Sequence, residues 1–173
     1  MAAAGCLSLA REAVRAALAR SAAFRTWTAT ADQTAALAKI HPHGLPDPAA
    51  SADKYSLVEL RTYRPYALIY TDVSGGYASR KDAQGFAKSG RIIIELEQDA
   101  TVGEGQSRAD VDQAWENTVG AIIDNLEAND GADVVASGVD LILGPLRNEP
   151  ENWPEYGEVN YAALAVNYAE GVQ

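Results

Sequence analysis

The sequence predicts an α+β fold, a mostly antiparallel β-sheet with two main helices packed on one face. Leu7–Ser21 and Asp110–Asn129 place apolar residues at helical spacing, while several other segments alternate apolar and polar residues as strands do. The connections between neighbouring strands are of hairpin scale, which favours antiparallel pairing. A length of 173 residues fits a single domain, 1–173, with its own hydrophobic core.

The first helix is predicted over Leu7–Ser21. Its apolar positions are Leu7, Ala10, Val14, Ala17 and Leu18. They form a narrow, alanine-rich face, which suits close packing on a sheet.

The segment Thr26–His41 allows two interpretations. Thr30 and Gln33 have the spacing of a capping box that opens a short helix through Ala38. Alternatively, Leu37–His41 forms a strand that is ended by the following proline. The sequence leaves both interpretations open.

Five segments rich in β-branched and aromatic residues predict strands. They are Tyr55–Thr62, Pro65–Asp72, Arg91–Glu97, Val139–Leu146 and Val159–Tyr168. The clearest is Arg91–Glu97, because Ile92, Ile94 and Leu96 share one face.

Three stretches without an apolar period predict loops. His41–Asp53 is rich in proline, and residues 73–89 form a long loop that contains glycine, lysine and arginine. Residues 147–158 form an acidic, proline-rich loop.

The second helix is predicted over Asp110–Asn129, with Asp110 and Gln113 as its cap and Gly131 at its end. Its apolar face consists of Val111, Trp115, Thr118, Val119, Ile122 and Leu126. Its acidic residues are Asp110, Asp112, Glu116, Asp124 and Glu127. No Lys or Arg lies between them, so this is either a solvated face or one that a basic partner covers.

Charge is divided unequally along the chain. Residues 1–91 hold 12 Lys and Arg against 7 Asp and Glu, whereas residues 92–173 hold 2 against 17. The halves therefore carry +5 and −15, which sum to the net charge of −10. Such asymmetry indicates either unevenly charged solvated surface or complementary contacts between copies.

Composition excludes several classes of protein. A hydrophobic content of 47% argues against disorder, and the lone Cys6 against a disulfide framework. No apolar run is long enough to span a membrane, and a pI near 4.6 argues against general nucleic-acid binding. The N-terminus lacks the pattern of a targeting peptide, so we expect synthesis in the cytoplasm.

Catalytic and metal-binding patterns are weak. We find no phosphate-binding, nucleophile-elbow or zinc-protease motif, and expect neither enzymatic activity nor a cofactor. His41 and His43, with Asp47 nearby, form either a partial metal site or two exposed loop histidines, and we favour the second. The acids around Trp153 are either paired carboxylates like those of glycosidases or a solvated surface, and we favour the second.

Six segments follow one another in an order and spacing that is familiar from a known family. They are Leu7–Ser21, Ile40–Pro46, Pro65–Asp72, Gly90–Glu95, Asp110–Asn129 and Asn160–Val166. This order resembles that of the tail terminator proteins of long-tailed bacteriophages, also called tail-completion or head–tail joining proteins.

The resemblance implies a non-enzymatic virion protein that forms a ring, usually of six copies, at the head-proximal end of the tail. Such a ring stops polymerisation of the major tail tube protein and presents a surface to the head-side connector or stopper. DNA passes through its lumen without sequence-specific binding, and no membrane is involved. The alternatives are a head-side connector or other minor virion protein, a small-ligand-binding α+β domain, or an acidic enzyme.

The charge division adds a hypothesis about the contacts between copies. A closed ring joins one patch to a different patch on the next copy, so basic and acidic residues can lie on separate patches. The candidate interface residues are Arg11, Arg15, Arg80, Lys81, Lys88, Asp112, Glu116, Asp124, Glu149, Glu151, Trp153 and Glu155.

Overall fold

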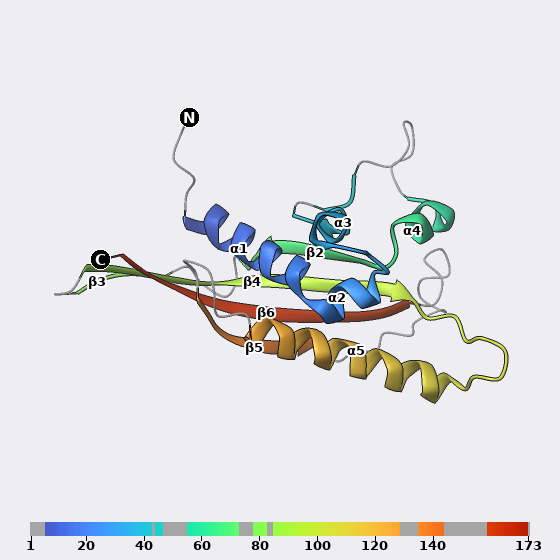
Figure 1. Cartoon of the computed structure of the whole chain (residues 1–173). Helices are drawn as coiled ribbons and strands as arrows, with labels where there is room; N and C mark the ends of the chain where they lie inside the picture. Colours follow the sequence, from blue (N-terminus) through green and yellow to red (C-terminus); the bar gives the residue numbers. More distant parts are fainter. Residues whose placement is uncertain are drawn as a thin grey trace.

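A six-stranded sheet forms the centre of the computed structural model (Figure 1). The structure describes residues 6–42, 44–46, 55–72, 78–82, 85–128, 135–143 and 159–172. The strands are β1 (Ile40–His41), β2 (Tyr66–Thr71), β3 (Ala78–Asp82), β4 (Gly85–Asp99), β5 (Val135–Leu143) and β6 (Val159–Val172). Their order is β1-β2-β4-β6-β5, with β3 also paired to β4. Only the β1–β2 pair is parallel among these strands, so the predicted α+β fold with a mostly antiparallel sheet is confirmed.

The helices are α1 (Cys6–Arg20), α2 (Ala22–Trp27), α3 (Gln33–Leu37), α4 (Leu57–Tyr63) and α5 (Arg108–Ala128). The two long helices, α1 and α5, were both predicted and cover the same face of the sheet, with α2 between them (Figure 1). None of the helices in the described ranges is long and apolar enough to cross a membrane.

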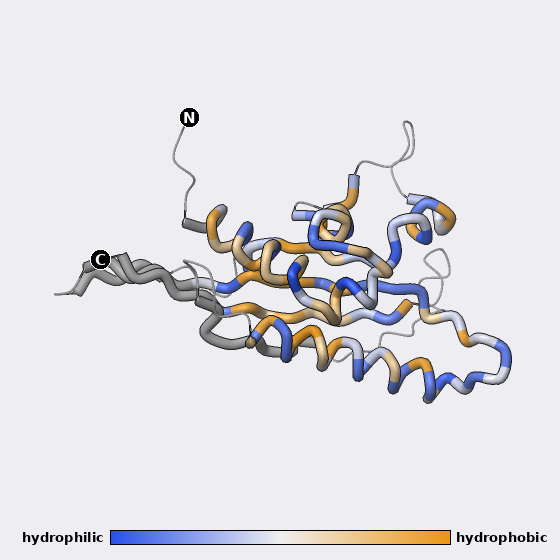
Figure 2. The backbone as a smooth tube through the Cα atoms, viewed as in Figure 1, coloured by the Kyte–Doolittle hydropathy of each residue, from blue (hydrophilic) through white to orange (hydrophobic). Residues whose placement is uncertain are grey.

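One hydrophobic core lies between the helices and the sheet. Strand alternation places Ile92, Ile94 and Leu96 of β4 toward the helices, beside Leu164 and Val166 of β6. The helices contribute Ala10, Val14, Leu18, Phe24, Trp115, Val119, Ile122 and Leu126. Figure 2 shows these apolar segments of β4 and β6 running side by side beneath the helices.

Both interpretations of Thr26–His41 apply, one after the other. The short helix α3 forms, but its N-cap is Asp32, whose side chain accepts a hydrogen bond from the Ala35 N–H. The strand β1 follows at Ile40–His41. Helix α2 was not predicted from the sequence, because six residues are too few to establish a helical period.

The predicted strand over Tyr55–Thr62 was wrong, because most of this segment is helix α4. Ser56 and Glu59 form a capping box in which the Ser56 side chain accepts from the Glu59 N–H and the Glu59 carboxylate accepts from the Ser56 N–H. This local pairing satisfies the free N–H groups of the first helical turn and outweighs the β propensity of the segment.

The predicted loop over 73–89 was wrong for residues 78–82 and 85–89, which form a hairpin of β3 with the start of β4. The same part of β4 pairs with the end of β6, from Phe86↔Val172 onward. These strand ends extend past the helices in Figure 1. These residues pair through their backbones. Their side chains do not alternate between apolar and polar, so the sequence carried no sign of strands here. The predicted loop 147–158 lies outside the described residues.

The ends of two further elements differ from the prediction. Helix α5 begins at Arg108, with Ser107 as the capping residue in place of Asp110. Strand β5 begins and ends earlier than Val139–Leu146, and β6 continues beyond Tyr168.

Candidate functional site

Arg11 and Arg15 lie one turn apart on α1, on the side that faces α3. Arg15 donates to the Leu37 carbonyl in α3 at 3.3 Å and to the Glu12 carboxylate at 3.4 Å. None of the ion pairs among the described residues involves Arg11. This side of α1 therefore carries positive charge that the visible part of the chain only partly balances.

The positive charge continues along the edge of the sheet formed by β1. Lys39 donates from Nζ to the Tyr63 carbonyl at 2.9 Å, which joins this edge to α4. Burial, and then the charges of Lys39 and Arg15, lower the pKa of His41 below its usual value. We call Arg11, Arg15 and Lys39 the basic edge.

Of the five acidic residues predicted on the second helix, two have a partner at the start of α5. The Asp110 carboxylate accepts hydrogen bonds from the backbone N–H and the hydroxyl of Ser107, and both lower the pKa of Asp110. Asp112 pairs with Arg108 at 2.9 Å, one turn earlier on the same helix. Both partners precede the predicted start of the helix, which is why the sequence interpretation overlooked them.

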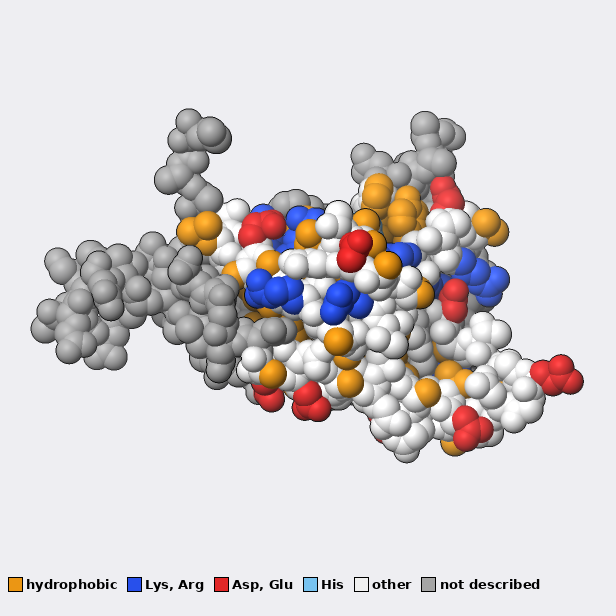
Figure 3. All heavy atoms as spheres, viewed as in Figure 1, with side chains coloured by type: hydrophobic (Ala, Val, Ile, Leu, Met, Phe, Trp, Pro, Cys, Tyr) orange, Lys and Arg blue, Asp and Glu red, His pale blue; other side chains and the backbone are white. Residues whose placement is uncertain are grey.

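Three exposed acids of α5 form no ion pair within the described ranges: Glu116, Asp124 and Glu127. We call them the acidic helix surface. Helix α5 packs on β5 and β6, at the opposite edge of the sheet from β1. Figure 3 shows acidic side chains along α5 and basic side chains over α1 and α2. Among the described residues, the acidic helix surface and the basic edge therefore lie at different edges of the sheet.

The other predicted interface residues lie apart from these surfaces or outside the described residues. Arg80 and Lys81 lie on β3 and Lys88 on β4, within one hairpin that is described by its backbone. Glu149, Glu151, Trp153 and Glu155 belong to the undescribed part of the chain. The assignment of these residues to a subunit interface stays a prediction.

An open groove of about 300 Å³ lies between α2 and α5. Its lining is Ala23, Thr26, Trp27, Asn117, Thr118 and Ala121. Trp27 is held in place because its indole N–H donates to the Gln98 side chain and its ring contacts Phe24 and Trp115. The sequence did not reveal this groove, because half of it belongs to the unpredicted helix α2.

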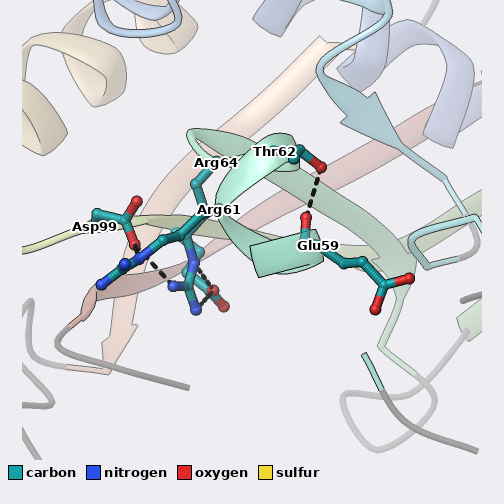
Figure 4. A network of polar contacts seen from close by, with 6 residues as sticks. Glu59, Arg61, Thr62, Arg64 and Asp99 are labelled. Atoms are coloured by element: carbon teal, nitrogen blue, oxygen red, sulfur yellow. Dashed lines mark hydrogen bonds and ion pairs between the residues drawn. The ribbon is translucent and has the colours of Figure 1, made fainter. Parts of the chain in front are cut away.

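A buried ionic cluster fixes the end of α4 against β4 (Figure 4). The guanidinium of Arg64, only 2% exposed, bonds to Glu97 at 2.6 Å and to Asp99 at 2.8 Å. Arg61 reaches the same Asp99 carboxylate at 3.9 Å, from an exposed position. Burial and the neighbouring Glu97 raise the pKa of Tyr66 above its usual value. This cluster positions α4, and with it the exposed residues of that helix.

His41 is not the exposed loop histidine that we favoured, because it lies in β1 and is half-buried. His41 packs edge-on against the rings of Tyr63 and Tyr66, while His43 and Asp47 lie outside the described residues. Within the described ranges no three His, Cys, Asp or Glu residues come together as a metal site would require. The Cys6 side chain is outside the description as well.

No family model matches this chain, and no curated protein matches it. Its fold is similar to that of a chain in a solved structure described as the virion of a native gene transfer agent (GTA) particle. The TM-score is 0.51 at 15% sequence identity, and the match covers 97% of this chain and 100% of that chain. At this identity the likeness concerns the fold, over the full length of both chains.

Proposed function

We propose that this chain is a structural protein of a phage-like virion, which forms a ring at the head-proximal end of the tail. In this role it ends polymerisation of the tail tube and joins the tail to the head, without catalysing a reaction. The observation that carries the proposal is the fold likeness to a chain of a virion particle, which spans both chains end to end. The order of helices and strands, typical of tail terminators, supports the same assignment.

The two charged surfaces suit a ring. In a closed ring each copy presents one patch to the copy before it and a different patch to the copy after it. The basic edge and the acidic helix surface lie on opposite edges of the sheet, so they are two different patches. Exposed ion pairs contribute about 0–1 kcal/mol each, so they select the neighbour and the direction around the ring more than they supply affinity.

The proposed partners are further copies of this chain, the major tail tube protein and a head-side connector or stopper protein. DNA passes through the lumen of the ring, and a net charge of −10 per copy opposes sticking of the DNA to it. The proposed location is the virion, at the joint between head and tail.

A phage or phage-like element that lacks this protein tests the proposal directly. We expect filled heads and unattached tails of irregular length in electron micrographs of the lysate. Tails of normal length attached to heads would refute the proposed role.

The mass of the purified protein separates the proposal from its alternatives. Light scattering should report an oligomer, with six copies as the expected ring. A monomer that binds a small molecule in the groove between α2 and α5 would favour the small-ligand-binding domain.

The likeness to a virion chain equally supports a protein on the head side of the joint. A mutant that lacks a different joining protein produces separate heads and tails. Purifying the two and asking which of them contains this chain distinguishes the tail-side role from the head-side role. A tail terminator stays with the tails, whereas a connector protein stays with the heads.

A further inference from the structure

The groove between α2 and α5 has the properties of a docking site for a side chain. Trp27 forms part of its wall and is already fixed by Gln98, Phe24 and Trp115, so a partner does not have to order it. Tryptophan is among the residues that contribute most to protein interfaces. The groove is open to solvent and shallow, which suits a protruding side chain of another protein surface.

An acidic side chain, Asp124, lies beside the groove on α5. Asp124 follows Ala121 by three residues on α5, so it lies on the same side of the helix. Asp124 is exposed and forms no ion pair with any described residue. Neither Lys nor Arg is among the residues that line the groove. The matching partner therefore presents an apolar side chain with a cation beside it.

Helix α4 presents such a pair. Val58 is 73% exposed, the most exposed of the large hydrophobic residues that the structure describes. Arg61 lies three residues further on and thus on the same side of the helix, and it is 53% exposed although it reaches Asp99 at 3.9 Å. The capping box at Ser56 and the buried Arg64 hold both ends of α4, so the pair sits on a rigid support.

We propose that Val58 of one copy packs into the groove of the next copy, where Arg61 faces Asp124. This inference rests on the proposed ring and names the two patches that meet in it. Helix α4 joins β1 and β2 at one edge of the sheet, whereas α5 packs on β5 and β6 at the other. A contact between opposite edges leaves a joined pair with one unused patch of each kind, so copies add in one direction until the ring closes.

Two variants that each damage one patch provide the test. Val58→Asp removes the apolar side chain and leaves the groove intact, while Ala121→Trp fills the groove and leaves α4 intact. Alone, each should raise the protein concentration needed for half-assembly about tenfold or more in sedimentation velocity. Mixed in equal amounts, they should form a dimer and stop there, because only one intact contact is available.

A charge swap tests the ion pair separately. Arg61→Glu or Asp124→Arg alone should weaken assembly several-fold, and the double variant should recover most of the loss. The matched control is Leu9→Ser, which removes an exposed apolar residue of α1 and should leave assembly unchanged. Circular dichroism melting of each variant shows that it folds.

The outcomes separate this inference from the proposed function. A ring whose mass and concentration dependence are unchanged in folded Val58→Asp and Ala121→Trp variants overturns the inference and leaves the ring standing. An unchanged ring that no longer joins heads to tails in the Ala121→Trp variant also overturns it, because the groove then receives a different virion protein. A natural chain that stays monomeric at every concentration overturns the ring, and this contact with it.

Discussion

The sheet is held in two different ways, by the apolar core beneath α1 and α5 and by the ionic cluster at the end of α4. In the core, Trp115, Ile94 and Leu164 are fully buried among other apolar side chains. In the cluster, one buried arginine is shared between two carboxylates that are partly exposed. A core loses stability in proportion to the volume removed, whereas a buried ion pair fails when either partner is lost.

The largest effect is expected in the core. Trp115→Ala should lower the free energy of unfolding by about 3–5 kcal/mol, because it leaves a cavity between α5 and the sheet. Trp115→Phe should cost clearly less, since much of the volume remains. Urea unfolding at one fixed protein concentration measures both, because association raises apparent stability. Equal losses for the two variants would contradict a graded response to volume.

In the ionic cluster, the loss of stability should depend on the geometry of the substituted side chain rather than on its volume. Arg64→Ala should cost about 2–4 kcal/mol, somewhat below a fully buried pair because Glu97 and Asp99 retain contact with water. Arg64→Lys keeps the charge but loses the planar fork, so it should recover only part of the stability.

Arg61→Ala is the matched control, because Arg61 contacts the same Asp99 from an exposed position. Its expected cost is about 0.5 kcal/mol or less. If the Arg61 and Arg64 variants unfold at the same urea concentration, burial is not what gives the cluster its strength.

The cap of α5 at Ser107 shows how much stability a polar contact contributes when it is exposed. Ser107→Ala should cost about 1 kcal/mol at pH 7. The pKa of Asp110 is lowered by its hydrogen bonds to Ser107, so that part of the stability is present above the usual aspartate pKa of about 3.9 and is lost as the pH falls through the lower folded value. The difference between natural chain and variant should therefore shrink below about pH 4, in thermal melts across a pH series. A difference that grows on acidification would contradict this sign.

A small gain in stability is expected on α5, at a position outside the ionic cluster. Gly120 lies within the helix, and an added Cβ would meet no atom within 4 Å. Gly120→Ala should therefore raise the free energy of unfolding by about 0.5–1 kcal/mol, through helix propensity alone. A destabilised variant in chemical denaturation would mean that this position is less open than the structure indicates.

The sequence predicted the long elements of the core, because burial of one side gives the sequence a regular spacing of apolar residues. Ile92, Ile94 and Leu96 alternate, and Trp115, Val119, Ile122 and Leu126 recur at helical spacing, so β4 and α5 were found. Helix α4 was missed although its signal, Ser56 followed by Glu59, is present in the sequence. A cap of two residues competes with the β propensity of a whole segment, and only the folded chain shows which prevails.

The candidate surfaces were predictable in kind but not in place. Counting residues revealed a basic and an acidic half, and the structure places three of the acids, Glu116, Asp124 and Glu127, on the exposed side of α5. Counting could not show that Arg108 reaches Asp112, nor that Arg64 is buried against Glu97 and Asp99. The first pairing depends on where a helix begins, and the second on how α4 and β4 lie against each other. A count of charges gives no information about either.

The ladder between β4 and β6 has a consequence for how the chain reaches its fold. It runs from Phe86↔Val172 to Asp99↔Val159, so its two strands are separated in sequence by all of α5 and β5. Pairings this distant form slowly, whereas α1 and α5 can form on the microsecond scale. During synthesis β4 leaves the ribosome well before its neighbour β6 has been made. In that interval its isoleucine-rich edge is open to other chains, which makes it the stage at which aggregation competes most strongly with folding.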